Sequence, residues 1–455
     1  MYSVHIKTFG CQMNKRDSEA LASRLASQGY LLTDSEQSAD IILLNTCSVR
    51  DNAEQKALNK MRMLIGRSKL QERKPLFGFL GCMAQAHGEQ LLEEIPGLQL
   101  VLGTHRSHKL PEYLEALLTD REKKIADCGG MEAPPVFLKD HIVPEKNSNS
   151  PLVSAFVNIM HGCDQYCTYC IVPETRGKEF SRPIADIVDE CSSLAKNGVK
   201  EVTLLGQIVT SYGKRLIRPS PEGLSPFVQL LEEVEKAEGI ERIRFTSPHP
   251  KGYGMDLVEA YGRLNKLCQS AHIPLQSGSN RILKAMRRGY TAERFLEILA
   301  QLRAVQPSIG VVTDIIVGFP GETEEDFQET INVVREARFD SAFIFKYSPR
   351  KYTVAAEMPD QVPMEMREER HARLMALVNE IARESYQQKI GTIQEVLVEG
   401  VSRRNVNRLQ GRSRCNKIVL FEGPSAWVGT IRKFRIVRAG QYSLYGEPIE
   451  TEKNK

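Results

Sequence analysis

The chain contains no long hydrophobic run. In its 455 residues no apolar stretch approaches the ~18 residues that a membrane-spanning helix needs. The first residues read as a strand and lack the apolar segment of a signal peptide. Internal repeats and low-complexity tracts are also absent. We therefore expect a cytoplasmic globular protein without a membrane span.

The composition is that of a large globular chain. Apolar residues make up 41% and charged residues 26%, as expected for a soluble fold. The length exceeds one ordinary hydrophobic core and suggests two to four domains. Ten cysteines without a secretion signal favour metal or redox use over disulfides.

Three of the cysteines stand close together. Cys163, Cys167 and Cys170 follow the spacing Cys-x-x-x-Cys-x-x-Cys. Three thiolates at this spacing can hold three corners of a cubane iron–sulfur cluster and leave its fourth iron open. A structural zinc site would need four ligands, and no fourth Cys or His completes a finger-like pair nearby. The spacing therefore favours a cluster over zinc.

The first hundred residues alternate between strand and helix patterns, which predicts an open parallel sheet. The expected strands cover residues 4–9, 40–45 and 75–81, and the expected helices cover 18–25, 52–65 and 89–94.

Three further cysteines each follow one of these strands. Cys11, Cys47 and Cys82 lie just past the first, second and third strand. Because the carboxyl ends of parallel strands share one edge, we expect the three thiols to converge there. The N-termini of the following helices would favour thiolates. We interpret the three as ligands of a second iron–sulfur cluster; the alternative is three unrelated core cysteines, since free cysteine is often buried.

Residues 104–150 look less regular, and the Pro- and Ser-containing stretches 133–135 and 145–151 read as a linker. A second alternating series follows. Its expected strands are 154–160, 201–206, 242–246, 272–275, 311–318 and 342–347, and its helices include 184–197, 226–237 and 325–337. Six strand–helix units suggest an open or closed partial barrel, with the Cys163 loop at the carboxyl-terminal rim, where barrels carry their chemistry.

The last part of the chain changes character. A long amphipathic helix is expected over 364–388, followed by short strands near 394–398, 417–421 and 432–439, which suggest a small β-barrel. The expected fold is therefore α/β, with an N-terminal open parallel sheet and helices, a central partial (β/α)6 barrel and a C-terminal small β-barrel. We expect the units to span residues 1–120, 121–150 (linker), 151–385 and 386–450.

The net charge of +4 is unevenly distributed. Residues 391–440 carry ten basic and three acidic side chains, a net charge of +7, so the rest of the chain sums to −3. A compact basic module on a near-neutral body is typical of a protein that binds a polyanion, most simply RNA. The alternative is a solvated basic face.

Taken together, the motifs resemble the methylthiotransferases, a subfamily of radical S-adenosylmethionine enzymes. The resemblance covers nearly the whole chain and is strongest to the branch that acts on N(6)-dimethylallyladenosine in tRNA. The runs that carry it are residues 45–56, 166–177, 204–207, 274–279, 314–323 and 345–350.

The resemblance implies two 4Fe–4S clusters, a radical one on Cys163, Cys167 and Cys170 and an auxiliary one on the N-terminal triad. One S-adenosylmethionine would methylate a sulfur on the auxiliary cluster, and a second would yield the radical that removes hydrogen from carbon 2 of the prenylated adenine beside the anticodon. The C-terminal module would be TRAM-like. An aromatic C–H has no useful acidity, so no catalytic residue beyond the cluster ligands is expected.

Polar residues near the strand ends are candidates for holding S-adenosylmethionine, with ordinary loop capping as the alternative. They are Tyr169, Gln207, Ser247, Gln276 and Asp314. The candidates for RNA contact are Arg403, Arg404, Arg412 and Arg432. The chain departs from the family pattern at Asp164, at Ile208 and at Lys351-Tyr352, where Asn, Asn and Pro-Gly are usual.

The resemblance also implies a partner and leaves rivals open. We expect a reducing protein such as flavodoxin or ferredoxin, a tRNA substrate and a monomeric enzyme. Related enzymes modify threonylcarbamoyladenosine in tRNA or an aspartate of a ribosomal protein. A rival of another class is a non-catalytic iron–sulfur protein that binds RNA.

Overall fold

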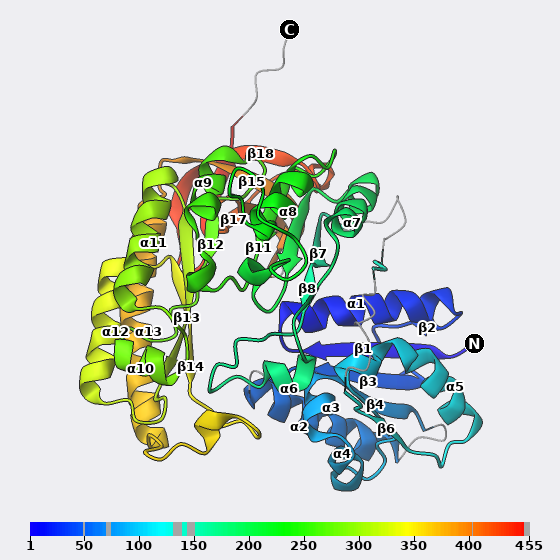
Figure 1. The fold of residues 1–455 in the computed structure, drawn as a ribbon. Coiled ribbons are helices and arrows are strands. Elements are labelled where there is room, and N and C mark those ends of the chain that lie inside the picture. The colour runs from blue at the N-terminus through cyan, green and yellow to red at the C-terminus, as the bar shows by residue number, and fades with distance from the viewer. Residues whose placement is uncertain (49–50, 70–73, 131–138, 143–150, 403, 450–455) are drawn as a thin grey trace.

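The computed structural model describes residues 1–455 except 49–50, 70–73, 131–138, 143–150, 403 and 450–455. Three units follow one another along the chain, and Figure 1 shows the N-terminal unit beside one end of the central unit and the C-terminal unit at its other end. In the described part of the chain, no helix combines the length and apolarity that crossing a bilayer would require.

The N-terminal unit is built on a six-stranded parallel sheet in the order β2-β1-β3-β4-β5-β6. Its central strand β3 is buried along its whole length, as expected for a parallel strand covered on both faces. The strands are β1 (Ser3–Phe9), β2 (Leu31–Leu32), β3 (Ile41–Thr46), β4 (Leu76–Gly81), β5 (Leu100–Leu102) and β6 (Ile125–Asp127). The predicted open parallel sheet is confirmed.

Of the predicted helices around this sheet, the first two are longer than expected and the third agrees to within one residue. The observed helices are α1 (Gln12–Ser27), α2 (Asp51–Ser68), α3 (Cys82–His87), α4 (Gln90–Glu94), the 3-10 helix η1 (Thr104–Lys109) and α5 (Leu110–Thr119). The expectation of irregular structure after residue 104 is wrong for η1, α5 and β6. Helix α5 could have been predicted from the helical spacing of Leu110, Leu114 and Leu117, which are buried on one face. We propose that this unit extends to residue 127.

The central unit consists of two three-stranded parallel sheets, β11-β10-β7 and β12-β13-β14, linked by a parallel bridge between Ile243 and Leu267. The six strands are β7 (Ser154–Asn158), β10 (Glu201–Leu205), β11 (Arg242–Phe245), β12 (Ser270–His272), β13 (Gly310–Val317) and β14 (Ser341–Lys346). The strand expected over 272–275 is shifted, because β12 ends before Pro274, which has no amide hydrogen for the ladder.

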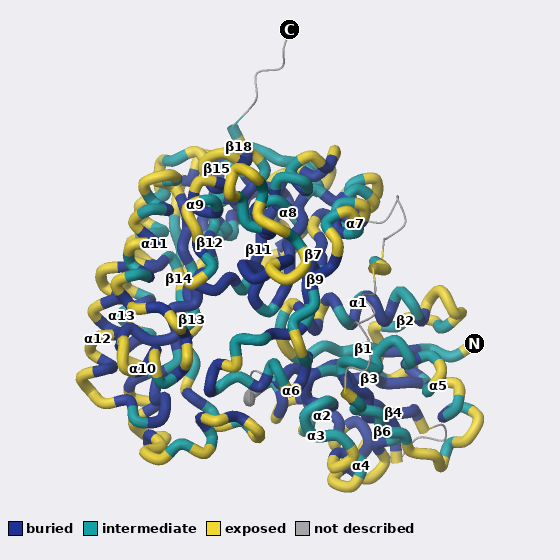
Figure 2. The backbone as a smooth tube through the Cα atoms, viewed as in Figure 1, coloured by how far each residue is buried: buried dark blue, intermediate teal, exposed yellow. Residues whose placement is uncertain are grey.

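Helices cover the outside of these strands, and Figure 2 shows their buried faces turned inward and their exposed faces outward. They are α7 (Ile184–Lys196), α8 (Pro226–Glu235), α9 (Met255–Arg263), α10 (Asn280–Ala285), α11 (Ala292–Val305), α12 (Glu324–Ala337) and α13 (Met364–Gln387). The short helix α6 (Val172–Arg176) lies instead against α3 and η1 of the N-terminal unit. Shorter elements are β8 (Met160–His161), β9 (Phe180–Ser181), η2 (Val209–Ser211), η3 (Pro250–Gly252) and η4 (Val354–Ala356). The predicted partial barrel of six strand–helix units is confirmed.

The C-terminal unit is a closed five-stranded barrel in the order β15-β16-β17-β19-β18. The strands are β15 (Ile393–Ser402), β16 (Asn405–Ser413), β17 (Ile418–Phe421), β18 (Ile431–Ala439) and β19 (Leu444–Pro448), with η5 (Ser425–Trp427) between β17 and β18. The predicted small β-barrel is confirmed, although β16 and β19 were not anticipated. The segment of β16, NVNRLQGRS, has few β-branched or aromatic residues, so its sequence carries little strand signal.

Buried charges attach this barrel to the amino-terminal ends of the central strands. Arg242, which is fully buried, donates to the carbonyl of Arg412 at 2.7 Å. Arg244 donates to the carbonyl of Ser413 at 2.8 Å. The ammonium of Lys417 lies 2.6 Å from the carboxylate of Asp340 just before β14. The C-terminal unit therefore closes one end of the central barrel.

Candidate active site

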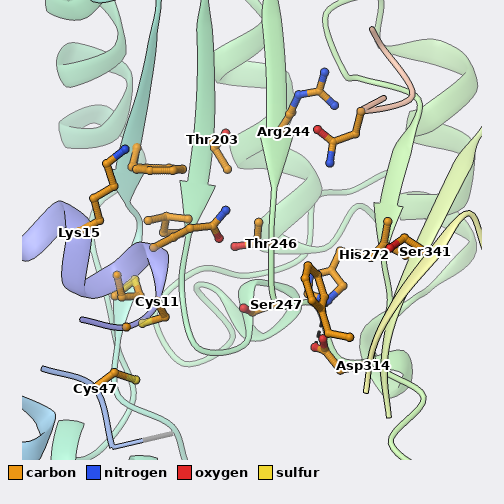
Figure 3. Close-up of a pocket in the computed structure, with 18 of the residues that line it drawn as sticks. Cys11, Lys15, Cys47, Thr203, Arg244, Thr246, Ser247, His272, Asp314 and Ser341 are labelled. Atoms are coloured by element: carbon orange, nitrogen blue, oxygen red, sulfur yellow. Dashed lines mark hydrogen bonds and ion pairs between the residues drawn. The ribbon is translucent and has the colours of Figure 1, made fainter. Parts of the chain in front are cut away.

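A cavity of about 2660 Å³ joins the three units. All six cysteines of the two predicted triads line it, together with the inward faces of β7, β10, β11, β12, β13 and β14 and residues of the C-terminal barrel. Figure 3 shows Cys11 and Cys47 on one side of this cavity and His272 and Asp314 on the other. The structure therefore brings two cysteine sets, far apart in sequence, to one shared space.

The N-terminal triad converges at the edge predicted from the strand pattern. In the sheet, Phe9 pairs with Thr46 and Thr46 pairs with Gly81, so β1, β3 and β4 end at the same level. Cys47 and Cys82 follow their strands directly, and Cys11 follows β1 after Gly10. A Cβ at Gly10 would lie 2.4 Å from the Cβ of Cys47. Only glycine therefore lets the first two loops approach so closely.

A buried amide pair holds the strand ends of this triad in place. The thiol of Cys11 donates to Oδ1 of Asn14 at 3.0 Å. Asn14, fully buried, donates to Oδ1 of Asn45 and to the carbonyl of Thr46, each at 3.1 Å. Asn45 donates back to the carbonyl of Asn14 at 3.0 Å. The reciprocal bonds fix the first turn of α1 to the end of β3 where the cysteines emerge, and sequence reasoning missed them.

The electrostatics of the N-terminal triad favour the thiolate form at Cys11 and not at Cys82. A hydrogen bond from the Cys47 side chain, aided by the charge of Arg176, overcomes burial and lowers the pKa of Cys11 to about 6. Burial raises the pKa of Cys82, although Arg176 opposes the rise. Arg176 is itself 3% exposed and lies 2.7 Å from the carboxylate of Asp17. The sequence analysis did not identify this arginine, which ends α6. Its position six residues after Cys170 could have pointed to it.

The second triad lies in the loop between β8 and α6. Cys163 and Cys167 are buried and Cys170 is half-buried. The amide of Cys163 donates to the carbonyl of Gly177 at 3.0 Å, and that of Cys170 donates to the carbonyl of Cys167 at 3.0 Å. Burial raises the pKa of Cys163 to about 11 and that of Cys170 to about 12. Thiols so deep in the protein need a strong electrophile, such as iron, to lose their protons.

A buried cation accompanies this second triad. Arg288 is 6% exposed, and its Nη1 lies 3.4 Å from Sγ of Cys167. Its Nε donates to the hydroxyl of Tyr290 at 3.3 Å, and that hydroxyl donates to the carbonyl of Leu275 at 2.8 Å. Each triad therefore has a nearby buried arginine whose charge would offset that of metal-bound thiolates. Arg288 is the second functional candidate that the sequence analysis missed.

The donor sets suit polynuclear clusters better than a single metal ion. Within the described residues, no three His, Cys, Asp or Glu side chains are grouped as ligands of one ion. A 4Fe–4S cluster distributes its thiolates over different irons, so its ligands need not meet at one point. Three soft sulfur donors at each site also match iron–sulfur chemistry. The residues present therefore fit two clusters, each with one iron left without a cysteine.

The predicted cofactor residues line the same cavity, between the two triads. Gln207 follows β10, and its Oε1 is buried without a hydrogen-bond partner among the described residues. Ser247 and Gln276, after β11 and β12, have φ angles of +57° and +66°, which non-glycine residues seldom adopt. An unsatisfied amide oxygen and two strained turns on one rim are the features expected of a ligand site.

Two further candidates differ from this group in their contacts. Tyr169 packs against the cluster formed by Met286 and Phe319, and burial raises the pKa of its hydroxyl. Asp314 lies inside the barrel on β13, where Nε2 of His272 is 3.0 Å from its Oδ2. The sequence analysis did not identify His272.

The predicted RNA contacts divide into two kinds. Arg403 lies outside the described residues, and Arg404 is exposed. The guanidinium of Arg412 points inward, 3.0 Å from Glu399, and Arg412 lines the cavity. The guanidinium of Arg432 stacks 4.1 Å from the ring centroid of Trp427, an arrangement that leaves little of the ring for a base. The net charge therefore overstates the cationic surface that faces outward.

Three family profiles match the chain in order. The Uncharacterized protein family UPF0004 matches residues 3–103, the Radical SAM superfamily matches 157–334, and the TRAM domain matches 387–449.

Full-length relatives match the whole chain. The tRNA-2-methylthio-N(6)-dimethylallyladenosine synthase of Opitutus terrae is 48% identical over 470 residues, covering 98% of this chain and 97% of the relative. The protein of the same name from Akkermansia muciniphila is 46% identical over 463 residues, with 98% and 99% covered.

Among solved structures, the radical S-adenosylmethionine methyltransferase TsrM from Kitasatospora setae, with cobalamin and a [4Fe-4S] cluster bound, superposes with a TM-score of 0.54. The match covers 87% of this chain and 77% of that chain at 14% identity, so it concerns the fold alone.

Proposed function

Because this chain belongs to the family of tRNA-2-methylthio-N(6)-dimethylallyladenosine synthases, we propose that it replaces the hydrogen on carbon 2 of a prenylated adenosine in tRNA with a methylthio group. The single observation that carries the proposal is the convergence of two cysteine triads on one cavity. A radical source and a sulfur source must both reach the same carbon atom, and a shared space is what that requires.

The radical S-adenosylmethionine family implies one 4Fe–4S cluster and S-adenosylmethionine; we propose Cys163, Cys167 and Cys170 as its ligands. We further propose that Cys11, Cys47 and Cys82 hold a second cluster. When bound, the two groups supply an electron for homolytic cleavage of S-adenosylmethionine and a sulfur that has been methylated by another S-adenosylmethionine. Every other contribution comes from side chains of the chain itself.

The described residues around the cavity have three tasks. Gln207, Ser247 and Gln276, on the rim beside the radical triad, hold the methionyl and ribose groups of S-adenosylmethionine. Arg176 and Arg288 balance the negative charge of the two thiolate sets. The C-terminal barrel closes the far end of the bore against water, which keeps a carbon radical from side reactions.

The proposed enzyme needs a tRNA substrate and a source of electrons. The TRAM-like barrel contributes tRNA affinity through its outward cations, and the cell supplies the electrons through a low-potential protein such as flavodoxin or ferredoxin. Because the substrate is tRNA, the reaction takes place in the cytoplasm. The proposed enzyme acts as a monomer.

The test uses the full-length chain after anaerobic reconstitution with iron and sulfide. With dithionite, S-adenosylmethionine and an anticodon stem-loop RNA carrying N(6)-dimethylallyladenosine, mass spectrometry of the nucleosides should show the 2-methylthio derivative, together with 5′-deoxyadenosine and S-adenosylhomocysteine. A non-catalytic iron–sulfur protein would give none of the three. Product on threonylcarbamoyl RNA, and none on prenylated RNA, would instead favour the related tRNA enzyme.

A further inference from the structure

The cavity contains a hydrogen-bonded acid–imidazole pair that takes no part in holding either cysteine triad. His272 on β12 and Asp314 on β13 lie 3.0 Å apart, Nε2 to Oδ2, and Figure 3 shows both across the cavity from Cys11 and Cys47. Their side chains are about one-quarter exposed, 23% and 22%. The pair therefore faces open space inside the barrel and is not part of a packed core.

The neighbours of Asp314 on its own strand are apolar. Along β13 the half-buried residues Val312, Asp314 and Ile316 alternate with fully buried ones and line the cavity. A carboxylate thus stands between two aliphatic side chains on one strand face. On β14, which pairs with β13, Phe343 also lines the cavity, is 49% exposed and has its ring centroid 6.3 Å from that of His272.

We propose that this surface, formed by His272, Val312, Asp314, Ile316 and Phe343, reads the prenylated adenine. The inference rests on the proposed function and names the residues that recognise its substrate. The exocyclic N6–H of the base donates to Asp314, the dimethylallyl group on the same nitrogen packs on Val312 or Ile316, and the purine ring lies against Phe343. An acceptor flanked by apolar groups is the complement of a secondary amine that carries a hydrocarbon.

His272 acts as a positioning residue. With its Nε2–H donating to Oδ2, as the geometry assigns, it fixes the orientation of the carboxylate. Oδ1 of Asp314 then has no partner among the described residues and remains free to accept the N6–H. A carboxylate without that support would turn toward water at the cavity mouth.

The pair lies on the inner side of the rim where S-adenosylmethionine is proposed to bind. Gln276 on the rim pairs with Ile315, whereas His272 pairs with Val312. His272 therefore lies three residues deeper in the bore than Gln276, toward the C-terminal barrel, whereas Asp314 lies one residue deeper and its carbonyl accepts from the amide of Gln276 at 2.8 Å. Because Asp314 is held by His272 and flanked by Val312 and Ile316, we reassign it from the cofactor to the base.

The same surface would discriminate between prenylated and threonylcarbamoylated adenosine. A threonylcarbamoyl group also leaves an N6–H, but it brings a carboxylate of its own. Beside Asp314 that carboxylate would be repelled, and against Val312 and Ile316 it would lose its hydration without a cation to replace water. The five residues of the proposed surface include no Lys or Arg, although cations such as Arg244 and Lys346 line other parts of the same cavity. The surface therefore favours the prenylated base over the threonylcarbamoylated one.

The experiment measures RNA binding and radical formation separately, on the reconstituted full-length protein. The RNAs are three anticodon stem-loops that differ at one base, which is adenosine, its N(6)-dimethylallyl derivative or its N(6)-threonylcarbamoyl derivative. The variants are Asp314→Asn, which keeps the shape and removes the charge, His272→Gln and Val312→Ser. Asp189→Asn, an exposed carboxylate on the outer helix α7, is the matched control. Uncoupled 5′-deoxyadenosine formation with dithionite and no RNA reports on S-adenosylmethionine binding.

The wild-type protein and the control should bind the prenylated RNA about tenfold or more tightly than the unmodified RNA. Val312→Ser should reduce that preference several-fold and leave the affinity for unmodified RNA unchanged. Asp314→Asn should raise the affinity for threonylcarbamoyl RNA relative to prenylated RNA about fivefold or more. His272→Gln should shift the same ratio in the same direction. The Asp189→Asn control should retain wild-type 5′-deoxyadenosine formation, and the same assay on Asp314→Asn separates a role at the base from a role at the cofactor.

Two results would overturn the assignment while leaving the proposed function intact. One is wild-type RNA preference in all three variants. The other is loss of uncoupled 5′-deoxyadenosine formation in a folded, iron-loaded Asp314→Asn protein, which would return Asp314 to the cofactor. Failure of the wild-type protein to methylthiolate prenylated RNA would instead remove the proposed function itself.

Discussion

The guanidinium of Arg176 lies 2.7 Å from the carboxylate of Asp17 and thereby joins the two halves of the candidate active site. Arg176 ends the helix that follows the Cys163–Cys170 loop, whereas Asp17 lies on α1, which begins directly after Cys11. The charge of Arg176 also acts on Cys11 and Cys82. One buried ion pair thus connects the loop of the radical triad with the environment of the N-terminal triad.

Replacing Arg176 with Gln should therefore impair the N-terminal triad selectively. The cysteines would lose a buried cation, and Asp17 would lose its partner. We expect the reconstituted variant to carry fewer irons than the wild-type protein and to reduce methylthio transfer by tenfold or more, at least about 1.4 kcal/mol of transition-state stabilisation. Uncoupled 5′-deoxyadenosine formation should persist.

Arg294→Gln is the matched control for this experiment. Its guanidinium also pairs with a carboxylate, that of Glu297, at 3.0 Å, but Arg294 is 41% exposed and lies on α11. Equal loss of methylthio transfer in both variants would show that Arg176 has no special relation to the triad.

The two triads should divide the chemistry between them. Cys11→Ala, Cys47→Ala and Cys82→Ala should each abolish methylthio transfer and leave 5′-deoxyadenosine formation, because the radical triad is intact. A protein with Cys163, Cys167 and Cys170 all changed to Ala should keep about half of the roughly eight irons expected for two cubanes. Iron analysis and chromatography of the reaction mixture measure both quantities. A folded triple variant without any iron would contradict independent clusters.

Lys417 should stabilise the protein by attaching the C-terminal barrel to the central one. Its side chain is 3% exposed and pairs with Asp340 at 2.6 Å. Lys417→Met leaves a buried carboxylate unpaired and should lower the free energy of unfolding by on the order of 3 kcal/mol. Lys433→Met, at an exposed position on β18, should change it by less than about 0.5 kcal/mol. Denaturant titration of each variant measures the difference, and similar values for both would contradict this role.

The outward cations of the same barrel should carry its RNA affinity. Changing Arg404, Lys433, Arg435 and Arg438 to Gln should weaken tRNA binding and reduce the dependence of log K on log salt, by about 0.7–0.9 for each phosphate that the protein no longer neutralises. The four side chains are exposed, so the fold should survive. Unchanged binding and an unchanged slope would place the RNA-binding surface elsewhere.

Docking of the N-terminal unit should depend on pH through His141. Its Nδ1 lies 3.2 Å from Glu19 on α1, and its Nε2 lies 2.8 Å from Glu190 on α7. Burial opposes protonation, but the two hydrogen bonds outweigh it and raise the pKa of His141. The charged form is therefore favoured in the folded state. Its stabilisation is fully present below the ordinary value of about 6.5 and is lost as the pH rises through the folded pKa.

The cations Arg16 and Arg182 also face Glu190, at 3.6 and 2.7 Å, and arginine does not titrate in this range. His141→Gln should therefore lower the melting temperature more at pH 5.5 than at pH 9. Thermal unfolding at the two pH values, with the wild-type protein beside the variant, measures this. A pH-independent difference would show that His141 acts as a neutral residue.

Local patterns in the sequence predicted the fold and the cysteine convergence because both follow from strand order and strand ends. Cys47 and Cys82 come straight after strong apolar strands, so their common edge could be inferred from parallel topology alone. The partners Arg176, Arg288 and His272 could not be inferred in this way. Their roles depend on long-range packing, such as the 121 residues that separate Arg288 from Cys167.

The basic C-terminal segment also shows that sequence alone does not reveal long-range contacts. The count of cations was correct, but a count cannot distinguish a side chain that faces solvent from one that faces a neighbouring unit. Arg414 donates to the carbonyls of Asn265 and Leu267, and Lys417 pairs with Asp340. These two cations are thus occupied in binding the central barrel.

The central claim is that one cavity delivers both a radical and a methylthio group to carbon 2 of the prenylated adenine. The most direct test is an anticodon stem-loop RNA carrying N(6)-dimethylallyladenosine with deuterium at carbon 2, incubated with the reconstituted protein, S-adenosylmethionine and dithionite. The account predicts one deuterium in each 5′-deoxyadenosine formed in a productive turnover, together with a 2-methylthio nucleoside that has lost its deuterium. A methylthio product accompanied by 5′-deoxyadenosine without deuterium would contradict it.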